Sequence, residues 1–157
     1  MFNEIYRVAL FGHRDFCQHK RLDDTLYPII KELLLTKDFV EIYIGRDGEF
    51  DIYAASIIKR VQMAMGAENS ELNLVLPYVR KDIEYYEKYY DRVSIPISAH
   101  PKIAITKRNE WVVEQADLVV CYVERKKGGA YAAMRYAENL GKEVLNLADN
   151  ECFVILT

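Results

Sequence analysis

Short segments rich in apolar and β-branched residues alternate along this chain with stretches of helical periodicity. The strand-like segments are residues 8–11, 39–44, 72–76, 116–123 and 143–147, and the helical ones are 20–36, 51–65, 82–91, 103–114 and 130–140. Runs that are apolar on both faces, such as 8–11 and 118–123, are typical of parallel strands covered by helices on both sides. The alternation therefore predicts an α/β fold, a three-layer sandwich around a mostly parallel sheet.

Prolines and glycines indicate where several of these segments end. Pro96 would confine a short strand at 92–96 to the edge of the sheet, because proline cannot donate a ladder hydrogen bond. Residues 152–156 are expected to add another edge strand. Gly66 and Gly141 are expected to end the second and the last helix, since glycine readily adopts the left-handed conformation that follows a helix.

The composition is that of one globular domain. The chain has 157 residues, of which 51% are hydrophobic and 29% charged, so we expect a single domain, residues 1–157. We find neither a signal peptide nor a run of about 18 apolar residues, and expect a cytoplasmic protein without membrane contact. The net charge of −3 argues against extensive nucleic-acid binding but is compatible with a local cationic pocket.

The cysteines show no spacing typical of metal ligands. Cys17, Cys121 and Cys152 contain no C-x-x-C pair, and Cys121 lies within an apolar strand. We therefore expect a buried, reduced thiol at this position, and neither a disulfide nor a metal site.

Glycines follow three of the predicted strands, where the chain enters a loop. The loop residues are Gly12, His13 and Arg14, then Gly45, Arg46, Asp47 and Gly48, and finally Gly128 and Gly129. Loops at the carboxyl ends of parallel strands form the crevice in which ligands bind, and they meet at a switch point if the last two strands flank the first. We expect Gly12 to turn sharply with a positive φ and approach the ligand. The helix that begins near Gly129 would direct its free amide groups at an anion such as phosphate.

Polar side chains near these loops have more than one interpretation. Arg108 would either pair with a phosphate or join two helices through a carboxylate. His13 would either contact the ligand or position its loop by bonding to the backbone. Asp47, Glu49 and Asp51 would contact ribose hydroxyls, act in acid–base catalysis, or serve only in turns and helix caps.

Taken in order, the loop motifs resemble those of the SLOG superfamily and, more narrowly, its small bacterial and phage members of the YpsA and YoqJ type. The matching motifs are Gly12-His13-Arg14, Gly45-x-Asp47-Gly48, Arg108-Asn109-x-Trp111, the run 116–120, Gly128-Gly129 and Tyr136-Ala137. The resemblance covers about residues 8–147 and implies a Rossmann-like fold whose glycine loops bind nucleotides or nucleotide-derived sugars. Neither a G-x-G-x-x-G motif nor a P-loop is present.

One departure from the superfamily bears on catalysis. Its LOG phosphoribohydrolases, which release a base from a nucleoside monophosphate, carry a glutamate on the helix after their glycine loop. Met134 stands at the corresponding position here, and Glu138, one turn further on, is expected to face solvent. Methionine can neither carry charge nor transfer a proton, so the resemblance leaves open whether the chain is an enzyme.

We expect a small domain that binds a nucleotide or an ADP-ribose-like ligand and has no separate cofactor. The expected contacts are Gly12, His13, Arg14, Gly45, Arg46, Asp47, Gly48, Asp51, Arg108, Asn109, Gly128 and Gly129. One alternative is an N-glycosidic hydrolase in which Asp47, Glu49 or Asp51 is catalytic. Another is single-stranded nucleic-acid binding through the basic loop 125–127 and the tyrosines; within the superfamily, the DNA processing protein A domain binds single-stranded DNA. Exposed tyrosines favour a homodimer.

Overall fold

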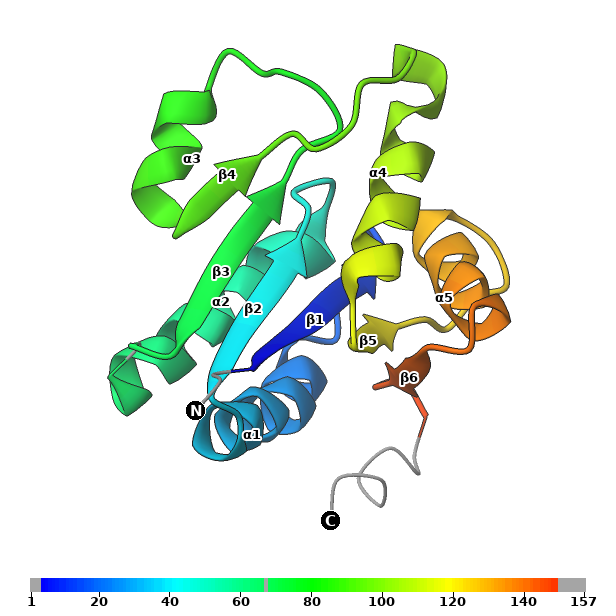
Figure 1. Ribbon diagram of the computed structural model, residues 1–157. Coiled ribbons are helices and arrows are strands. Elements are labelled where there is room, and N and C mark those ends of the chain that lie inside the picture. Colours follow the sequence, from blue (N-terminus) through cyan, green and yellow to red (C-terminus); the bar gives the residue numbers. More distant parts are fainter. Residues whose placement is uncertain (1–3, 67, 150–157) are drawn as a thin grey trace.

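The computed structural model describes residues 4–66 and 68–149, in which strands and helices alternate along the chain (Figure 1). The strands are β1 (Ile5–Gly12), β2 (Phe39–Ile44), β3 (Ser70–Val75), β4 (Arg92–Ser94), β5 (Leu118–Tyr122) and β6 (Glu143–Asn146). The helices are α1 (His19–Thr36), α2 (Glu49–Met65), α3 (Ile83–Tyr89), α4 (Pro101–Gln115) and α5 (Gly129–Asn139). The strand order is β4-β3-β2-β1-β5-β6, and every neighbouring pair is parallel. The predicted α/β class and mostly parallel sheet are confirmed.

The sheet is the middle layer of three. Val8 and Leu10 of β1 belong to a core cluster that α1 and α2 complete, whereas Ala9 and Phe11 belong to a second cluster completed by α4 and α5. Successive side chains of a strand point to opposite faces, so a strand buried on both faces must be apolar throughout. This explains the uninterrupted apolar run at the start of the chain and confirms the three-layer arrangement.

Most of the expected boundaries differ from the observed ones by one or two residues. The short strand β4 lies at the edge of the sheet, and Gly66 and Gly141 have φ values of 86° and 74° at the ends of α2 and α5, as predicted. Helix α2 begins two residues earlier than expected. The expected edge strand at 152–156 lies outside the described residues.

Strand β1 is the switch point of the sheet, because the chain builds outward from it in both directions. It pairs with β2 on one side and with β5 on the other. The loops that leave β1, β2 and β5 therefore open at the same end of the sheet (Figure 1). Cys121 on β5 is a fully buried free thiol, as expected, and burial raises its pKa to about 12.

Within residues 4–66 and 68–149, none of the helices has the length and apolar character needed to cross a membrane.

Candidate functional site

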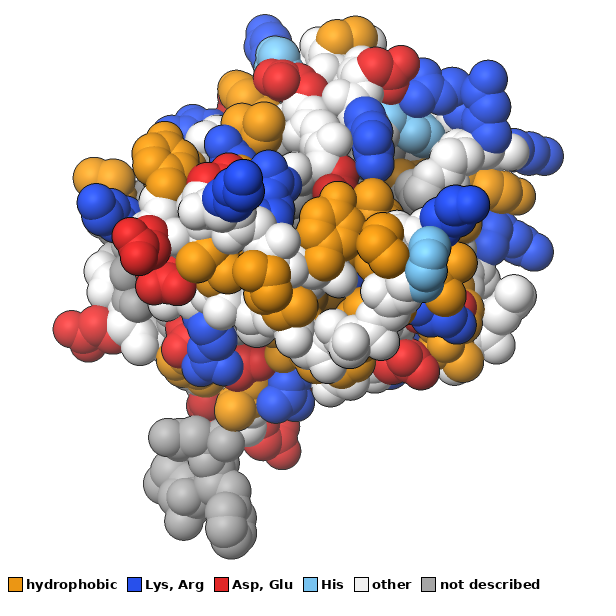
Figure 2. Space-filling model, turned by 90° about the horizontal axis from the view of Figure 1, so that it is seen from above, with side chains coloured by type: hydrophobic (Ala, Val, Ile, Leu, Met, Phe, Trp, Pro, Cys, Tyr) orange, Lys and Arg blue, Asp and Glu red, His pale blue; other side chains and the backbone are white. Residues whose placement is uncertain are grey.

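A pocket of about 640 Å³ lies at the carboxyl ends of β1, β2 and β5. It is lined by eleven of the twelve residues that the sequence predicted as ligand contacts. Its apolar wall is formed by Phe11 of β1, Ile105 and Val112 of α4, and Ala130 of α5. Seen from above, this end of the molecule presents Lys and Arg side chains beside hydrophobic ones (Figure 2). The loops that are far apart in sequence thus form one cavity.

Arg46 is the predicted contact that does not line this pocket. Its guanidinium group donates a hydrogen bond to the Tyr90 hydroxyl at 3.0 Å and lies 5.0 Å from the centre of the Tyr86 ring. Glu49, a catalytic candidate, is also outside the pocket lining, and its carboxylate lies 3.4 Å from Nε2 of His19, the first residue of α1. The Arg46 and Glu49 side chains therefore interact with residues of α1 and of α3 and its carboxyl end, and not with the pocket.

Two glycines of the site are required by close packing. Gly12 does not have the positive φ that we expected; a Cβ atom there would overlap the Phe50 ring. A Cβ atom at Gly48 would overlap the backbone of Arg14. The Glu49 amide donates to the Arg14 carbonyl at 2.9 Å, so these glycines hold the first two loops against each other.

Arg108 joins three segments at the wall of the pocket. The side chain is 3% exposed, forms an ion pair with Asp47, and donates to the Val75 carbonyl at 2.8 Å. Its Nε donates to the Asn109 Oδ1 atom at 2.8 Å, which orients the Asn109 amide nitrogen toward Gly129. Each guanidinium nitrogen therefore has a protein acceptor, so the arrangement matches the interpretation of Arg108 as a joining residue, here between α4 and the loop after β2.

His13 positions the loop after β1. It is 7% exposed, and its Nε2 atom accepts a hydrogen bond from the Glu124 amide at 3.1 Å. Burial, together with the positive charge of Arg125, lowers the pKa of His13. A neutral imidazole is required for this hydrogen bond, so the second interpretation of His13 fits the structure.

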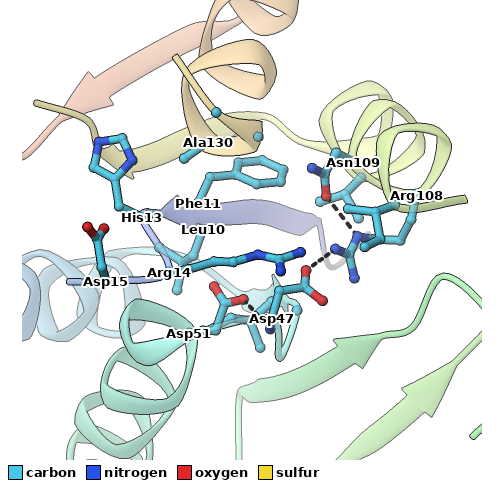
Figure 3. Close-up of a pocket in the computed structure, with 18 of the residues that line it drawn as sticks. Leu10, Phe11, His13, Arg14, Asp15, Asp47, Asp51, Arg108, Asn109 and Ala130 are labelled. Carbon is cyan, nitrogen blue, oxygen red and sulfur yellow. Dashed lines mark hydrogen bonds and ion pairs between the residues drawn. The ribbon is translucent and has the colours of Figure 1, made fainter. Parts of the chain in front are cut away.

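Arg14 reaches across the pocket toward Asp47 (Figure 3). Within the described parts of the chain its guanidinium group makes neither a hydrogen bond nor an ion pair, and the same holds for the Lys127 amine. Arg125, by contrast, contacts Asp15 through two hydrogen bonds of 2.7 and 3.1 Å. Arg14 and Lys127 are therefore the cations that a ligand would meet.

The amino terminus of α5 also faces the pocket. Gly128 precedes the helix with a φ of 92° and provides no side-chain cap, and Gly129 and Ala130 line the cavity. The first amide groups of a helix have no intrahelical acceptor, and the helix dipole places partial positive charge there. This end of α5 thus adds hydrogen-bond donors to the cationic side of the pocket.

Asp47 and Asp51 differ in environment although they lie four residues apart. Asp47 forms an ion pair with Arg108. Asp51 is 8% exposed and accepts the Asp47 amide at 3.0 Å. Burial raises the pKa of Asp51 to about 7, despite that hydrogen bond and the positive charges of Arg108 and Arg14. Among the candidate acids, Asp51 is one that lines the pocket and whose pKa burial raises toward neutrality.

Some features of the site were not predicted. Lys127, which precedes the predicted Gly128-Gly129 pair, lines the pocket but was not among the expected contacts. Its position in the basic loop 125–127 is a sequence signal that could have identified it. The apolar contributions of Ile105 and Val112 had no such signal, because neither lies near a strand end. Met134 packs against the core, whereas Glu138 is exposed and pairs with Arg135 as a surface residue.

Comparison with known proteins identifies solved structures that have a similar fold. No protein-family model matches the sequence, and no curated protein matches it either. The structure is similar to DNA processing protein A of Streptococcus pneumoniae, with a TM-score of 0.64, 15% identity, and coverage of 97% of this chain and 56% of that one. It is also similar to DNA processing protein A of Helicobacter pylori, which binds single-stranded DNA, with a TM-score of 0.60, 17% identity, and coverage of 88% and 63%.

At these identities the similarity concerns the fold, and the chain spans less than two thirds of the length of either protein. The chain therefore has a Rossmann-like fold similar to that of DNA processing protein A, as its resemblance to the SLOG superfamily implied.

Proposed function

We propose that this domain binds a nucleotide or a nucleotide-derived ligand such as ADP-ribose in the pocket at the carboxyl ends of β1, β2 and β5. One observation carries the proposal: a cavity of about 640 Å³ contains two cations, Arg14 and Lys127, without ion-pair partners among the described residues. This volume lies within the range of about 300–1,000 Å³ that is typical of small-ligand sites.

The lining suits the parts of such a ligand. Arg14, Lys127 and the first amides of α5 would bind the phosphate groups, because charged donors and a helix amino terminus both favour anions. The Asp47 carboxylate would accept hydrogen bonds from ribose hydroxyls. The base would lie against the apolar wall that contains Phe11 and Val112.

Two neighbouring lysines provide a matched test. Lys127 lines the pocket, whereas Lys126 is exposed and does not. Isothermal titration calorimetry with AMP and ADP-ribose should show binding that Lys127→Ala weakens by about tenfold, corresponding to about 1.4 kcal/mol, and that Lys126→Ala leaves unchanged. Equal losses in the two variants, or no binding of either nucleotide, would contradict the proposal. A titration with an oligothymidylate distinguishes a preference for single-stranded DNA.

A second candidate function is hydrolysis of an N-glycosidic bond. It is favoured by the buried Asp51 carboxyl in the pocket, whose pKa of about 7 suits a general acid or base. Incubation with nucleoside monophosphates and NAD derivatives, followed by chromatography for free base, tests it. Turnover that disappears in Asp51→Asn supports hydrolysis, and an intact nucleotide after prolonged incubation excludes it for these substrates.

A further inference from the structure

The charges that line the pocket do not balance. Among the cations, Arg108 pairs with Asp47 and Arg125 pairs with Asp15. This leaves two cations, Arg14 and Lys127, and one carboxyl group, Asp51, in the lining. His13 adds no charge near neutral pH, because its pKa is lowered. The net charge offered to an anion therefore depends on whether Asp51 carries a proton.

Asp51 lies close to Arg14, one of these two cations. In the close-up its carboxyl group lies beneath the Arg14 side chain and next to Asp47 (Figure 3). One of its oxygens is occupied by the Asp47 amide. An ionised Asp51 attracts the Arg14 guanidinium, whereas a protonated Asp51 leaves Arg14 available to a ligand.

We propose that Asp51 is a specificity-determining residue that competes with the anionic group of the ligand for Arg14, so that the anion binds together with a proton taken up by Asp51. The inference rests on the proposed function, because it concerns the ligand of that pocket. Asp51 would select ligands that carry an anionic oxygen for Arg14 and, next to it, a hydrogen-bond acceptor for the protonated carboxyl group. A pyrophosphate provides both. The protonated carboxyl donates to that acceptor, and the ionised carboxylate repels it.

The charged and titratable groups around Asp51 give the direction of the pH dependence. They are Asp47 from the loop after β2, Arg14 from the loop after β1, Arg108 from α4 and Tyr90 from the end of α3. An added anion raises the pKa of Asp51 further, because it disfavours a second negative charge. Affinity is therefore highest below pH 7 and falls by up to about tenfold per pH unit above it.

ADP-ribose is the appropriate probe, because its pyrophosphate lacks the phosphomonoester proton that titrates near pH 6 in AMP. Calorimetry in buffers of different ionisation enthalpy measures the protons taken up per ligand. About one pH unit above the pKa of Asp51, we expect uptake approaching one proton in the unmodified protein and none in Asp51→Asn. The amide still accepts the Asp47 N–H, so binding persists and becomes independent of pH. Asp24→Asn, which removes an exposed carboxylate of α1, should behave like the unmodified protein.

The possible results separate the two proposals. ADP-ribose binding without proton uptake, or with the same pH dependence in Asp51→Asn, overturns the inference and leaves the proposed function standing. Failure of every nucleotide to bind overturns both. A ligand-free measurement gives an independent check: carboxyl-carbon NMR should show Asp51 titrating near pH 7, and a midpoint near its ordinary value of about 4 overturns the inference whether or not a ligand binds.

Discussion

Asp51→Asn should make the domain more stable than the unmodified protein at alkaline pH. Burial raises the pKa of Asp51 from 3.8 to about 7 in the folded state, so the folded protein binds the proton more tightly than the unfolded chain does. Unfolding free energy then falls as pH rises from about 4 to 7. A shift of about three units at about 1.4 kcal/mol each gives a loss of about 4 kcal/mol.

Urea denaturation followed by far-UV circular dichroism at about pH 5 and pH 8 measures this loss. We expect the stability difference between Asp51→Asn and the unmodified protein to change by about 3 kcal/mol between these pH values, in favour of the variant at the higher pH, because about two pKa units separate pH 5 from the folded pKa of about 7. Asp24→Asn serves as the control, because its carboxylate is exposed on α1. Parallel pH profiles for Asp51→Asn and the unmodified protein would refute a buried carboxyl with a raised pKa.

Three further perturbations follow from the packing of the site. Gly12→Ala should lower the unfolding free energy by about 1–3 kcal/mol, because its Cβ atom would overlap the Phe50 ring; an unchanged urea midpoint would contradict this. Arg108→Ala should cost at least about 3 kcal/mol, because it leaves Asp47 and the Val75 carbonyl without their buried partner, and calorimetric unfolding would show whether the loss is smaller. The lowered pKa of His13 means that its contribution to stability is complete above about pH 6.5 and is lost as pH falls through the folded pKa; imidazole NMR should show a midpoint below that value.

The sequence alone was sufficient for the layers of the fold. Residues 8–11 are apolar without interruption because helices cover both faces of β1. The sequence pattern predicts the second strand at its observed bounds, residues 39–44, because strand periodicity is a local property. The meeting of the three loops is also predictable from sequence, since the loops that follow parallel strands lie at one end of the sheet. Gly12 and Gly128 accordingly line one cavity.

Only the tertiary structure decided which charges remain available in that cavity. Arg46 and Arg108 follow equally plausible motifs, but Arg46 contacts Tyr90 and Arg108 pairs with Asp47, whereas Arg14 has no ion-pair partner among the described residues. The raised pKa of Asp51 likewise depends on how completely the surrounding elements exclude water. Ion pairing and desolvation depend on distances between segments that are remote in the chain. The local periodicity of a sequence does not determine those distances.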